Sequence, residues 1–308
     1  MADFPGSLPE LIRRFPDAAA CADWLIRQRW PAGFVCPACG GAKAWRLAAK
    51  AHTFECAGCG RQTSVTAGTL MHGSKLPLTL WFQAAFLFAT HSNGMSAVQL
   101  KEMLGLGSYK TAWLLLAKLR RAMVAPGRQP LAGFVEVDET YIPLRRKDEP
   151  PAGGFGRSSQ GKICIAGAVE FVDAGPRRIR LAPITDASTN SLAGFVAGAV
   201  ARGAQMKTDG WSAYGAIPDV KHDPHVIGPM AAHILLPWTH RIFANLKRWA
   251  LGVYHGLRAK HLQSYLDEFT FRFNRRRNRH AAFQSLFKIA AAAKPITYNM
   301  LIKPEPTG

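Results

Sequence analysis

Acidic residues are scarce in this sequence. Twenty Asp and Glu stand against 39 Lys and Arg among 308 residues, so the formal net charge is +19 at pH 7. A surface this basic attracts polyanions, and nucleic acid is the first partner to expect. The excess is spread along the chain with a dense run at residues 272–279. The alternative is charge that serves only solubility or forms a basic tail.

Long hydrophobic runs are also missing. The longest candidate, residues 80–89, is far shorter than the roughly 20 apolar residues that a membrane-spanning helix needs. The N-terminus lacks the basic-then-apolar layout of a signal peptide. We therefore expect a cytoplasmic protein with no membrane partner.

Cysteine is sparse, with six residues, and four of them form two Cys-x-x-Cys pairs. In a chain without an export signal this pattern favours metal over disulfides. Each pair can form a tight knuckle that aims two thiolates at one ion, and two knuckles close a tetrahedral Zn²⁺ site. We expect one structural zinc ion in a zinc ribbon, held by Cys36, Cys39, Cys56 and Cys59.

Helical patterns follow the cysteine pairs. Two helices, at residues 97–104 and 108–123, are joined by the turn Gly105-Leu106-Gly107, which is the layout of a helix-turn-helix. The start and the basic side of the second helix would then contact DNA. An ordinary helical linker domain is the alternative. The candidate DNA-binding residues are Ser108, Tyr109, Lys110, Thr111, Arg120 and Arg121.

A buried strand at residues 135–142 carries a carboxylate, Asp138, in its middle. Such a group needs a partner or a metal, because burying an unpaired charge is costly. Two strands, a helix and a short strand that ends at Asp209 come next, and a long helix begins near residue 239. This order predicts an RNase-H-like α/β fold, a mixed sheet flanked by helices, in which Asp138 and Asp209 lie side by side. Two carboxylates so placed can hold two Mg²⁺ ions for attack on a phosphodiester.

Four stretches resemble bacterial insertion-sequence transposases: VDETY at 137–141, DGWSAY at 209–214, HRxxxNLKRW at 240–249 and YLDEFxFRFNRR at 265–276. The branch that is resembled carries a zinc ribbon, a helix-turn-helix and a catalytic domain of the Asp-Asp-Glu type. The resemblance implies cleavage at the terminal inverted repeats of an element and strand transfer into target DNA. It also implies a nucleoid-associated homo-oligomer, because strand transfer joins two ends.

The third acidic position of that class is not acidic here. The family spacing from Lys247 puts His240 there, and the resemblance implies that Asp138, Asp209 and His240 hold two Mg²⁺ or Mn²⁺ ions. His240 and Lys247 are two helical turns apart and share one face. Asn245 is the second candidate for the third ligand and Glu268 the third. The resemblance further implies that Lys247 contacts a phosphate of the element's end, and Arg248 is counted with it as DNA-binding.

Two other functions fit parts of the sequence: a non-enzymatic DNA-binding regulator, which leaves both aspartates without a role, and a nuclease of the same fold that only hydrolyses. The predicted domains are a helical lead-in at 1–30, a zinc ribbon at 31–75, a helix-turn-helix domain at 76–125, an RNase-H-like catalytic domain at 131–285 and a tail at 286–308.

Overall fold

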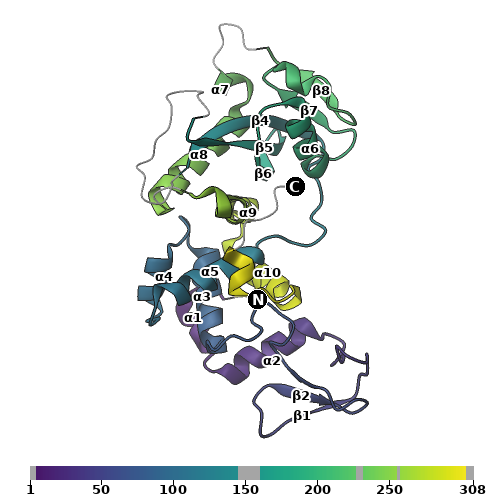
Figure 1. The fold of residues 1–308 in the computed structure, drawn as a ribbon, viewed down its shortest axis with the longest axis vertical. Helices are drawn as coiled ribbons and strands as arrows, with labels where there is room; N and C mark the ends of the chain where they lie inside the picture. The colour runs from purple at the N-terminus through teal and green to yellow at the C-terminus, as the bar shows by residue number, and fades with distance from the viewer. Residues whose placement is uncertain (1–4, 145–159, 227–231, 255–256, 303–308) are drawn as a thin grey trace. The chain divides into compact units, whose positions relative to one another are not determined.

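The computed structural model describes residues 5–144, 160–226, 232–254 and 257–302. Contacts within the chain form two compact units, and Figure 1 labels their elements. Unit 1 consists of Met1–Pro126 together with Asn278–Lys303, and unit 2 contains Gly127–Arg277. No helix in these described stretches is both long enough and apolar enough to cross a membrane.

Unit 1 contains a small antiparallel sheet that supports the cysteine pairs. Its order is β1-β2-β3, with Trp45 opposite Glu55 and Phe54 opposite Thr63. The strands are short because a four-thiolate site, rather than a hydrophobic core, holds such a ribbon together. They span Ala44–Arg46 (β1), Thr53–Cys56 (β2) and Gln62–Ser64 (β3).

The helices of unit 1 begin where the sequence supplies caps. The side chains of Ser7, Asp17, Ser96 and Ser108 accept hydrogen bonds from backbone N–H groups in the first turns of α1, α2, α4 and α5. The Glu10 carboxylate accepts from the N–H of Gly6, the residue before the cap, at 2.8 Å. The helices are Leu8–Arg14 (α1), Ala18–Arg29 (α2), Leu78–Thr90 (α3), Ala97–Met103 (α4), Tyr109–Arg121 (α5), Arg279–Ala292 (α10) and Tyr298–Ile302 (α11).

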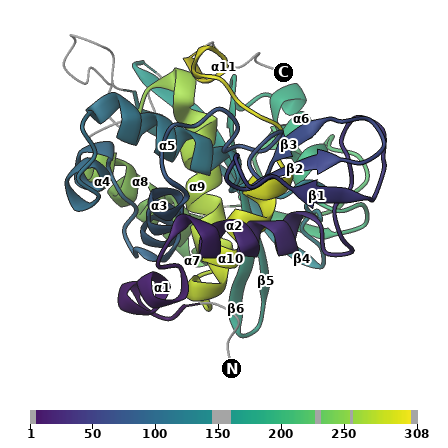
Figure 2. The ribbon, with the colours of Figure 1, turned by 90° about the horizontal axis from the view of Figure 1, so that it is seen from below.

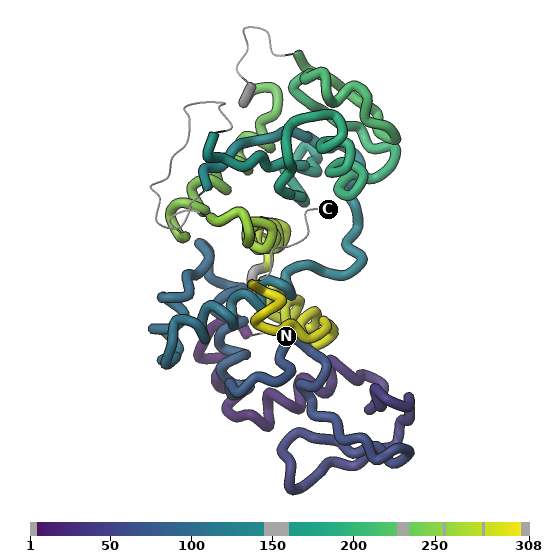
Figure 3. Tube along the Cα trace, in the orientation of Figure 1, coloured from purple at the N-terminus to yellow at the C-terminus, as the bar shows by residue number. Residues whose placement is uncertain are grey.

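Helix α10, which follows the last helix of unit 2 in the chain, belongs to unit 1. After α9 the trace continues into α10, drawn in yellow (Figure 3), and α10 packs against α2 and α3 (Figure 2). Phe283 and Phe287 are buried there and contact the rings of Trp24 and Phe82. The contact boundary at residue 277 therefore differs from the predicted boundary at 285, because burial of these two rings ties residues 279–292 to the N-terminal helices.

Unit 2 is built on a five-stranded mixed sheet of order β6-β5-β4-β7-β8. Strand β4 pairs antiparallel with β5, which pairs antiparallel with β6. On its other side β4 pairs parallel with β7, and β7 pairs parallel with β8. The strands are Phe134–Pro143 (β4), Lys162–Val172 (β5), Gly175–Ile184 (β6), Gln205–Thr208 (β7) and Lys221–Pro224 (β8).

Helices cover both faces of this sheet, and this confirms the predicted fold class. On one face Val135, Val137 and Ala166 form a core with Leu192 and Val196 of α6. On the other face Ile165, Val169 and Leu181 pack with α8 and α9. Alternation along each strand separates the two cores. The flanking elements are Thr189–Ala199 (α6), Ser212–Tyr214 (η1), Ala232–Leu235 (α7), Pro237–Tyr254 (α8), Ala259–His261 (η2) and Leu262–Asn274 (α9).

Candidate active site and metal centre

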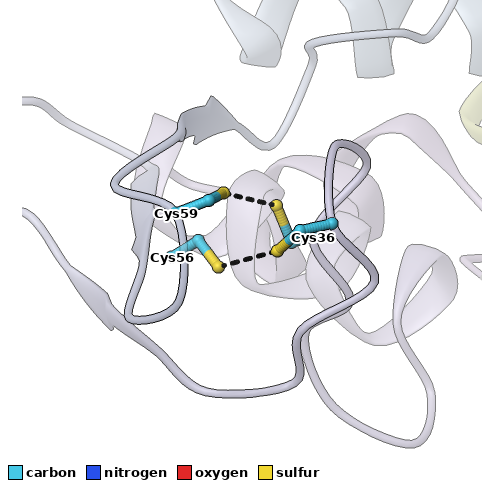
Figure 4. Close-up of side chains that lie close together, drawn as sticks. Cys36, Cys56 and Cys59 are labelled. Carbon is cyan, nitrogen blue, oxygen red and sulfur yellow. Dashed lines mark hydrogen bonds between the residues drawn. The ribbon is translucent and has the colours of Figure 1, made fainter.

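The four cysteines of the ribbon converge on one point in unit 1. Sulfur atoms of Cys36 and Cys59 lie 3.7 Å apart, and those of Cys39 and Cys56 lie 3.5 Å apart. All four sulfurs lie within 4.8 Å of one another, and Figure 4 shows Cys36, Cys56 and Cys59 turned towards a common centre. Tetrahedral zinc with Zn–S bonds of about 2.3 Å requires sulfurs about 3.8 Å apart. The donor set therefore fits one structural zinc ion.

Each cysteine pair lies in a knuckle with the same backbone pattern. The N–H of Gly40 donates to the Cys36 carbonyl, and the N–H of Gly60 donates to the Cys56 carbonyl, both at 2.9 Å. Both glycines have positive φ, 74° and 65°, which side-chain-bearing residues rarely adopt. Hydrogen bonds from the backbone N–H groups of Cys39 and Ala38 lower the pKa of Cys36 to about 6. These bonds favour the thiolate form of Cys36, the form that binds metal. The Gly41 N–H lowers the pKa of Cys39, but hydrogen bonds with the other three thiols outweigh this effect and raise it to about 12.

In unit 2, Asp138 lies in the middle of β4 as predicted. Its side chain is almost fully buried, and its Oδ1 accepts a hydrogen bond from the N–H of Glu139 at 2.9 Å. Its Oδ2 lies 3.7 Å from Nε2 of His240 in α8. The structure therefore brings together one carboxylate and the imidazole that the family spacing singled out.

Asp209 follows the end of β7, on the strand next to β4. The parallel register pairs Glu136 with Lys207, and Asp209 comes one residue after β7 ends at Thr208. Continued by two residues, this register would bring Asp209 to the level of Asp138 on the neighbouring strand. Oδ1 of Asp209 accepts from the N–H of Trp211 at 3.0 Å, which fixes the carboxylate in the turn.

Tyr214 lies on the other face of the sheet and contacts Glu139, the residue after Asp138. Its hydroxyl donates to Oε2 of Glu139 at 2.6 Å, so it ties the segment that follows Asp209 to β4. Burial, then the negative charges of Glu139, Asp138 and Asp209, raise the pKa of Tyr214 well above its ordinary value. The negative charges of Asp138 and Asp209 therefore both act on Tyr214.

The spacing of the three candidate ligands is wider than that of a single-ion site. Among the described residues, only the four cysteines bring three or more His, Cys, Asp or Glu ligand atoms within 4.8 Å of one another. The ligand atoms of Asp138, Asp209 and His240, two carboxylates and one imidazole, therefore do not all lie within 4.8 Å of one another. Hard divalent ions prefer oxygen donors, and imidazole is better tolerated by Mn²⁺ than by Mg²⁺. In donor chemistry these residues fit two such ions.

Lys247 is half-buried on α8, seven residues after His240. Burial lowers its pKa, the charge of Lys162 lowers it further, and the charge of Asp138 opposes both. Its ammonium group therefore lies in the field of Asp138, where a DNA phosphate would also be held. Arg248 is exposed on the same helix.

The two alternative third ligands lie in different surroundings. Asn245 is exposed, and its side-chain oxygen accepts from Arg248 at 2.8 Å. Glu268 in α9 is fully buried, where it accepts from Tyr254 at 3.1 Å and pairs with Arg272 at 2.9 Å. Of the three candidates, His240 is the one that the structure brings to Asp138.

A second histidine–carboxylate pair, not predicted from the sequence, lies near Asp209. Nε2 of His225 lies 3.1 Å from Oδ2 of Asp223, at the end of β8. Asp223 pairs with Lys207 in the register, and so it lies on the face that carries Asp138. The segment KHDPH at 221–225 is polar throughout and has no apolar alternation that would predict a strand.

The arginine run at 272–279, predicted to favour polyanions, is largely occupied within unit 2. Arg275 and Arg276 stack over the rings of Phe271 and Phe273, each 3.9 Å from the ring centre. Asn274 accepts from the N–H of Ile179 at 2.8 Å and donates to its carbonyl at 3.3 Å. Its amide thus takes the place of a neighbouring strand along the free edge of β6. Arginine 279 has no described side chain.

The predicted helix-turn-helix residues also differ in accessibility. Tyr109 is 54% exposed and Arg121 is exposed, whereas Arg120 is only 3% exposed, with its guanidinium over the ring of Phe88. Successive residues of a helix point to different sides, so Arg120 faces the core while its neighbour Arg121 faces solvent. The Ser108 hydroxyl caps α5 by accepting from the N–H of Thr111 at 3.1 Å, and Lys110 lies over Tyr298. We therefore remove Arg120 from the candidate DNA-binding surface.

Each of the two units contains a segment that matches the model of a known protein family. Residues 130–274 match the model of the ISXO2-like transposase domain, and residues 16–62 match that of the transposase zinc-ribbon domain. Together these matches cover more than half of the chain. The chain is also 25% identical over 278 residues to an uncharacterized protein in the transposable element ISH50 of Halobacterium salinarum, with 85% of this chain and 92% of that protein covered. The chain belongs to the insertion-sequence transposases that join a zinc ribbon to an ISXO2-like transposase domain.

Proposed function

We propose that this transposase cleaves DNA at the terminal inverted repeats of its own element and joins the freed ends to target DNA. What supports the proposal is that β4, which carries Asp138, pairs in parallel with β7, which leads into Asp209, and that Nε2 of His240 lies 3.7 Å from Oδ2 of Asp138. A regulator that only binds DNA would have no use for this arrangement, since buried acids are costly to maintain.

Asp138, Asp209 and His240 would hold two Mg²⁺ or Mn²⁺ ions. When bound, such ions supply activation of the attacking water or 3′-hydroxyl and stabilisation of the leaving oxygen. The protein's own residues set the geometry. The Trp211 N–H fixes one oxygen of Asp209, and the Glu139 N–H fixes one oxygen of Asp138. The imidazole of His240 presents Nε2 towards the other oxygen of Asp138.

The cationic groups beside these acids would bind the DNA backbone. Lys247 shares a helix face with His240, so its ammonium group would contact a phosphate next to the bond that is cut. Arg248 is exposed one residue on and would add a second contact. Family membership implies DNA as the partner. The start of α5, with Tyr109 and Thr111, and the exposed Arg121 at its end would help unit 1 bind the element ends. Because two ends must be joined, the working form would be a homo-oligomer.

Cleavage of an oligonucleotide that carries one element end, taken from the DNA flanking the gene, tests the proposal. Asp138→Asn and Asp209→Asn should each abolish cleavage and strand transfer while DNA affinity is retained. The matched control is Asp219→Asn, because Asp219 is an exposed acid in the same unit that pairs only with exposed Arg202. Full activity of either active-site variant would refute the assignment.

The same assay distinguishes a transposase from a nuclease. A transposase joins the cleaved 3′ end to a second duplex, whereas a nuclease releases only the cleaved product. The third ligand is tested by comparing His240→Ala with Asn245→Ala. We expect the histidine variant to lose most of its activity and the asparagine variant to lose less, and the reverse order would move the third ligand to Asn245.

A further inference from the structure

Glu136 is the other acid on the face of β4 that carries Asp138, two residues earlier in the strand. Its side chain is 1% exposed. Its Oε2 accepts hydrogen bonds from the N–H of Trp238 and from the N–H of Thr239, both at 2.9 Å. The hydroxyl of Thr239 lies 3.3 Å from the same oxygen. One carboxylate oxygen of the sheet therefore receives the first turn of α8.

These contacts replace a cap that α8 does not have in its own sequence. The first N–H groups of a helix have no partner within it. Pro237 opens α8 and has no N–H, so the next two residues present the unsatisfied donors. The positive end of the helix dipole also favours a carboxylate at this place. Glu136 thus caps α8 from a strand about 100 residues earlier in the chain.

The capped turn is the one that leads directly into His240. Glu136 holds residues 238 and 239, and the next residue places Nε2 3.7 Å from Asp138. Glu136 and Asp138 lie on the same face because they are two residues apart in a strand. The same helical turn is therefore attached to β4 at two neighbouring points, one through its backbone and one through the imidazole.

We propose that Glu136 is a positioning residue that sets the place of His240 relative to Asp138, through its hydrogen-bond acceptor rather than through its charge. The inference rests on the proposed function of His240 as a metal ligand. An apolar side chain would pack well among Val169 and Phe243 on this face, so a buried acid here has a specific task. The one neighbouring cation in the register, Lys207, is on β7 and not on α8.

Two conservative variants separate an acceptor role from a charge role. Glu136→Gln keeps the length and one carbonyl acceptor but removes the charge. Glu136→Asp keeps the charge but shortens the reach by about one C–C bond, or about 1.5 Å. If the acceptor positions α8, the Gln variant keeps most of the activity and the Asp variant loses about 100-fold, as a 1 Å misplacement can cost. If the charge tunes the site, the order is reversed, and that order would overturn the inference.

A double-mutant cycle with His240→Ala tests whether Glu136 acts through His240. Glu136→Asp should lower cleavage strongly in the wild-type background and less than about twofold in the His240→Ala background. An equal loss in both backgrounds would mean a general structural role and would overturn the inference. Thr239→Val is the matched control, because it removes the weaker hydroxyl contact and keeps both N–H donors.

Two measurements on the full-length protein do not depend on catalysis. Hydrogen exchange at the amides of Trp238 and Thr239 should rise in Glu136→Asp and stay unchanged in Glu136→Gln. The Mn²⁺ concentration for half-maximal binding, followed by electron paramagnetic resonance, should rise about tenfold in the Asp variant only. Unchanged exchange and Mn²⁺ binding in Glu136→Asp would overturn the inference. Failure of the proposed function looks different, because Asp138→Asn would then leave cleavage intact.

Discussion

Gly167→Ala should displace the helix that carries His240 and so reduce activity from a position that touches neither DNA nor metal. Gly167 lies opposite Asp138 on β5, beneath α8. A Cβ added there would lie 2.5 Å from Cε1 and 2.8 Å from Cζ of Phe243. Non-bonded carbons prefer separations of about 3.5–4.0 Å, so the ring must withdraw by about 1 Å. Leu181, 3.1 Å from the same Cβ, blocks a small sideways shift.

The magnitude follows from this overlap. Overpacking a core costs about 1–3 kcal/mol, and a 1 Å misplacement of a catalytic group can cost about 100-fold in rate. We therefore expect Gly167→Ala to remain folded, to lose a few kcal/mol of stability at most, and to cleave the element end about 100-fold more slowly. Cleavage rates and thermal unfolding of the purified variant measure both effects.

Two further variants make the test specific. Phe243→Leu in the Gly167→Ala background removes the ring that meets the new methyl group, so it should restore most of the activity. Gly194→Ala, in α6 on the other face, is the control, because a Cβ there would meet nothing within 4 Å. Wild-type rates in Gly167→Ala, or no recovery on adding Phe243→Leu, would refute the reasoning about α8.

Three other predictions concern zinc, pH and DNA. Purified protein should contain about one zinc ion per chain, and the Cys39→Ser variant should lose it. The control is Cys164→Ala, which changes a buried cysteine of unit 2 and should keep the zinc. Equal zinc contents in the two variants would refute the ribbon site. Burial raises the pKa of Glu136 above its ordinary value of 4.5, although hydrogen bonds from Thr239 and Trp238 act in the opposite direction. As pH rises, Glu136 therefore keeps its proton to a higher pH in the folded protein than in the unfolded chain. The unfolding free energy of the wild type minus that of Glu136→Gln should therefore be greatest below about pH 4.5 and fall as pH rises through the folded pKa; a rise in denaturation experiments would contradict this sign. Arg121→Ala should weaken DNA binding and reduce the dependence of log affinity on log salt concentration by about 1. Arg120→Ala removes a buried cation over Phe88 and should reduce stability instead. Weaker DNA binding in Arg120→Ala and not in Arg121→Ala would restore Arg120 to the DNA-binding surface.

Patterns that depend on neighbouring residues were predicted well. The helices predicted at residues 97–104 and 108–123 form at Ala97–Met103 and Tyr109–Arg121, and the short strand predicted before Asp209 spans Gln205–Thr208. The Cys-x-x-Cys pairs predicted the zinc centre, because a knuckle is a local structure whose chemistry is visible in its spacing. The alternation in β4 likewise placed Glu136 and Asp138 on one face.

The rest depends on contacts between segments that are distant in the sequence. Strand β8 has the polar sequence KHDP, and its place is set by pairing with β7 rather than by propensity. Arg276 reads as a surface charge, yet it donates to the carbonyl of Arg177 at 3.0 Å, about 100 residues earlier in the chain. The role of Glu136 required knowing that α8 begins above it. A count of charges does not show which Lys and Arg side chains already make contacts within the fold.

The central claim is that Asp138, Asp209 and His240 together hold the catalytic ions. It is tested most directly by the anomalous scattering of manganese in crystals of the protein with a cleaved element end. We predict two manganese ions held by Asp138, Asp209 and His240. Manganese bound by Asn245 or Glu268 in place of His240, or no manganese beside Asp138, would contradict it.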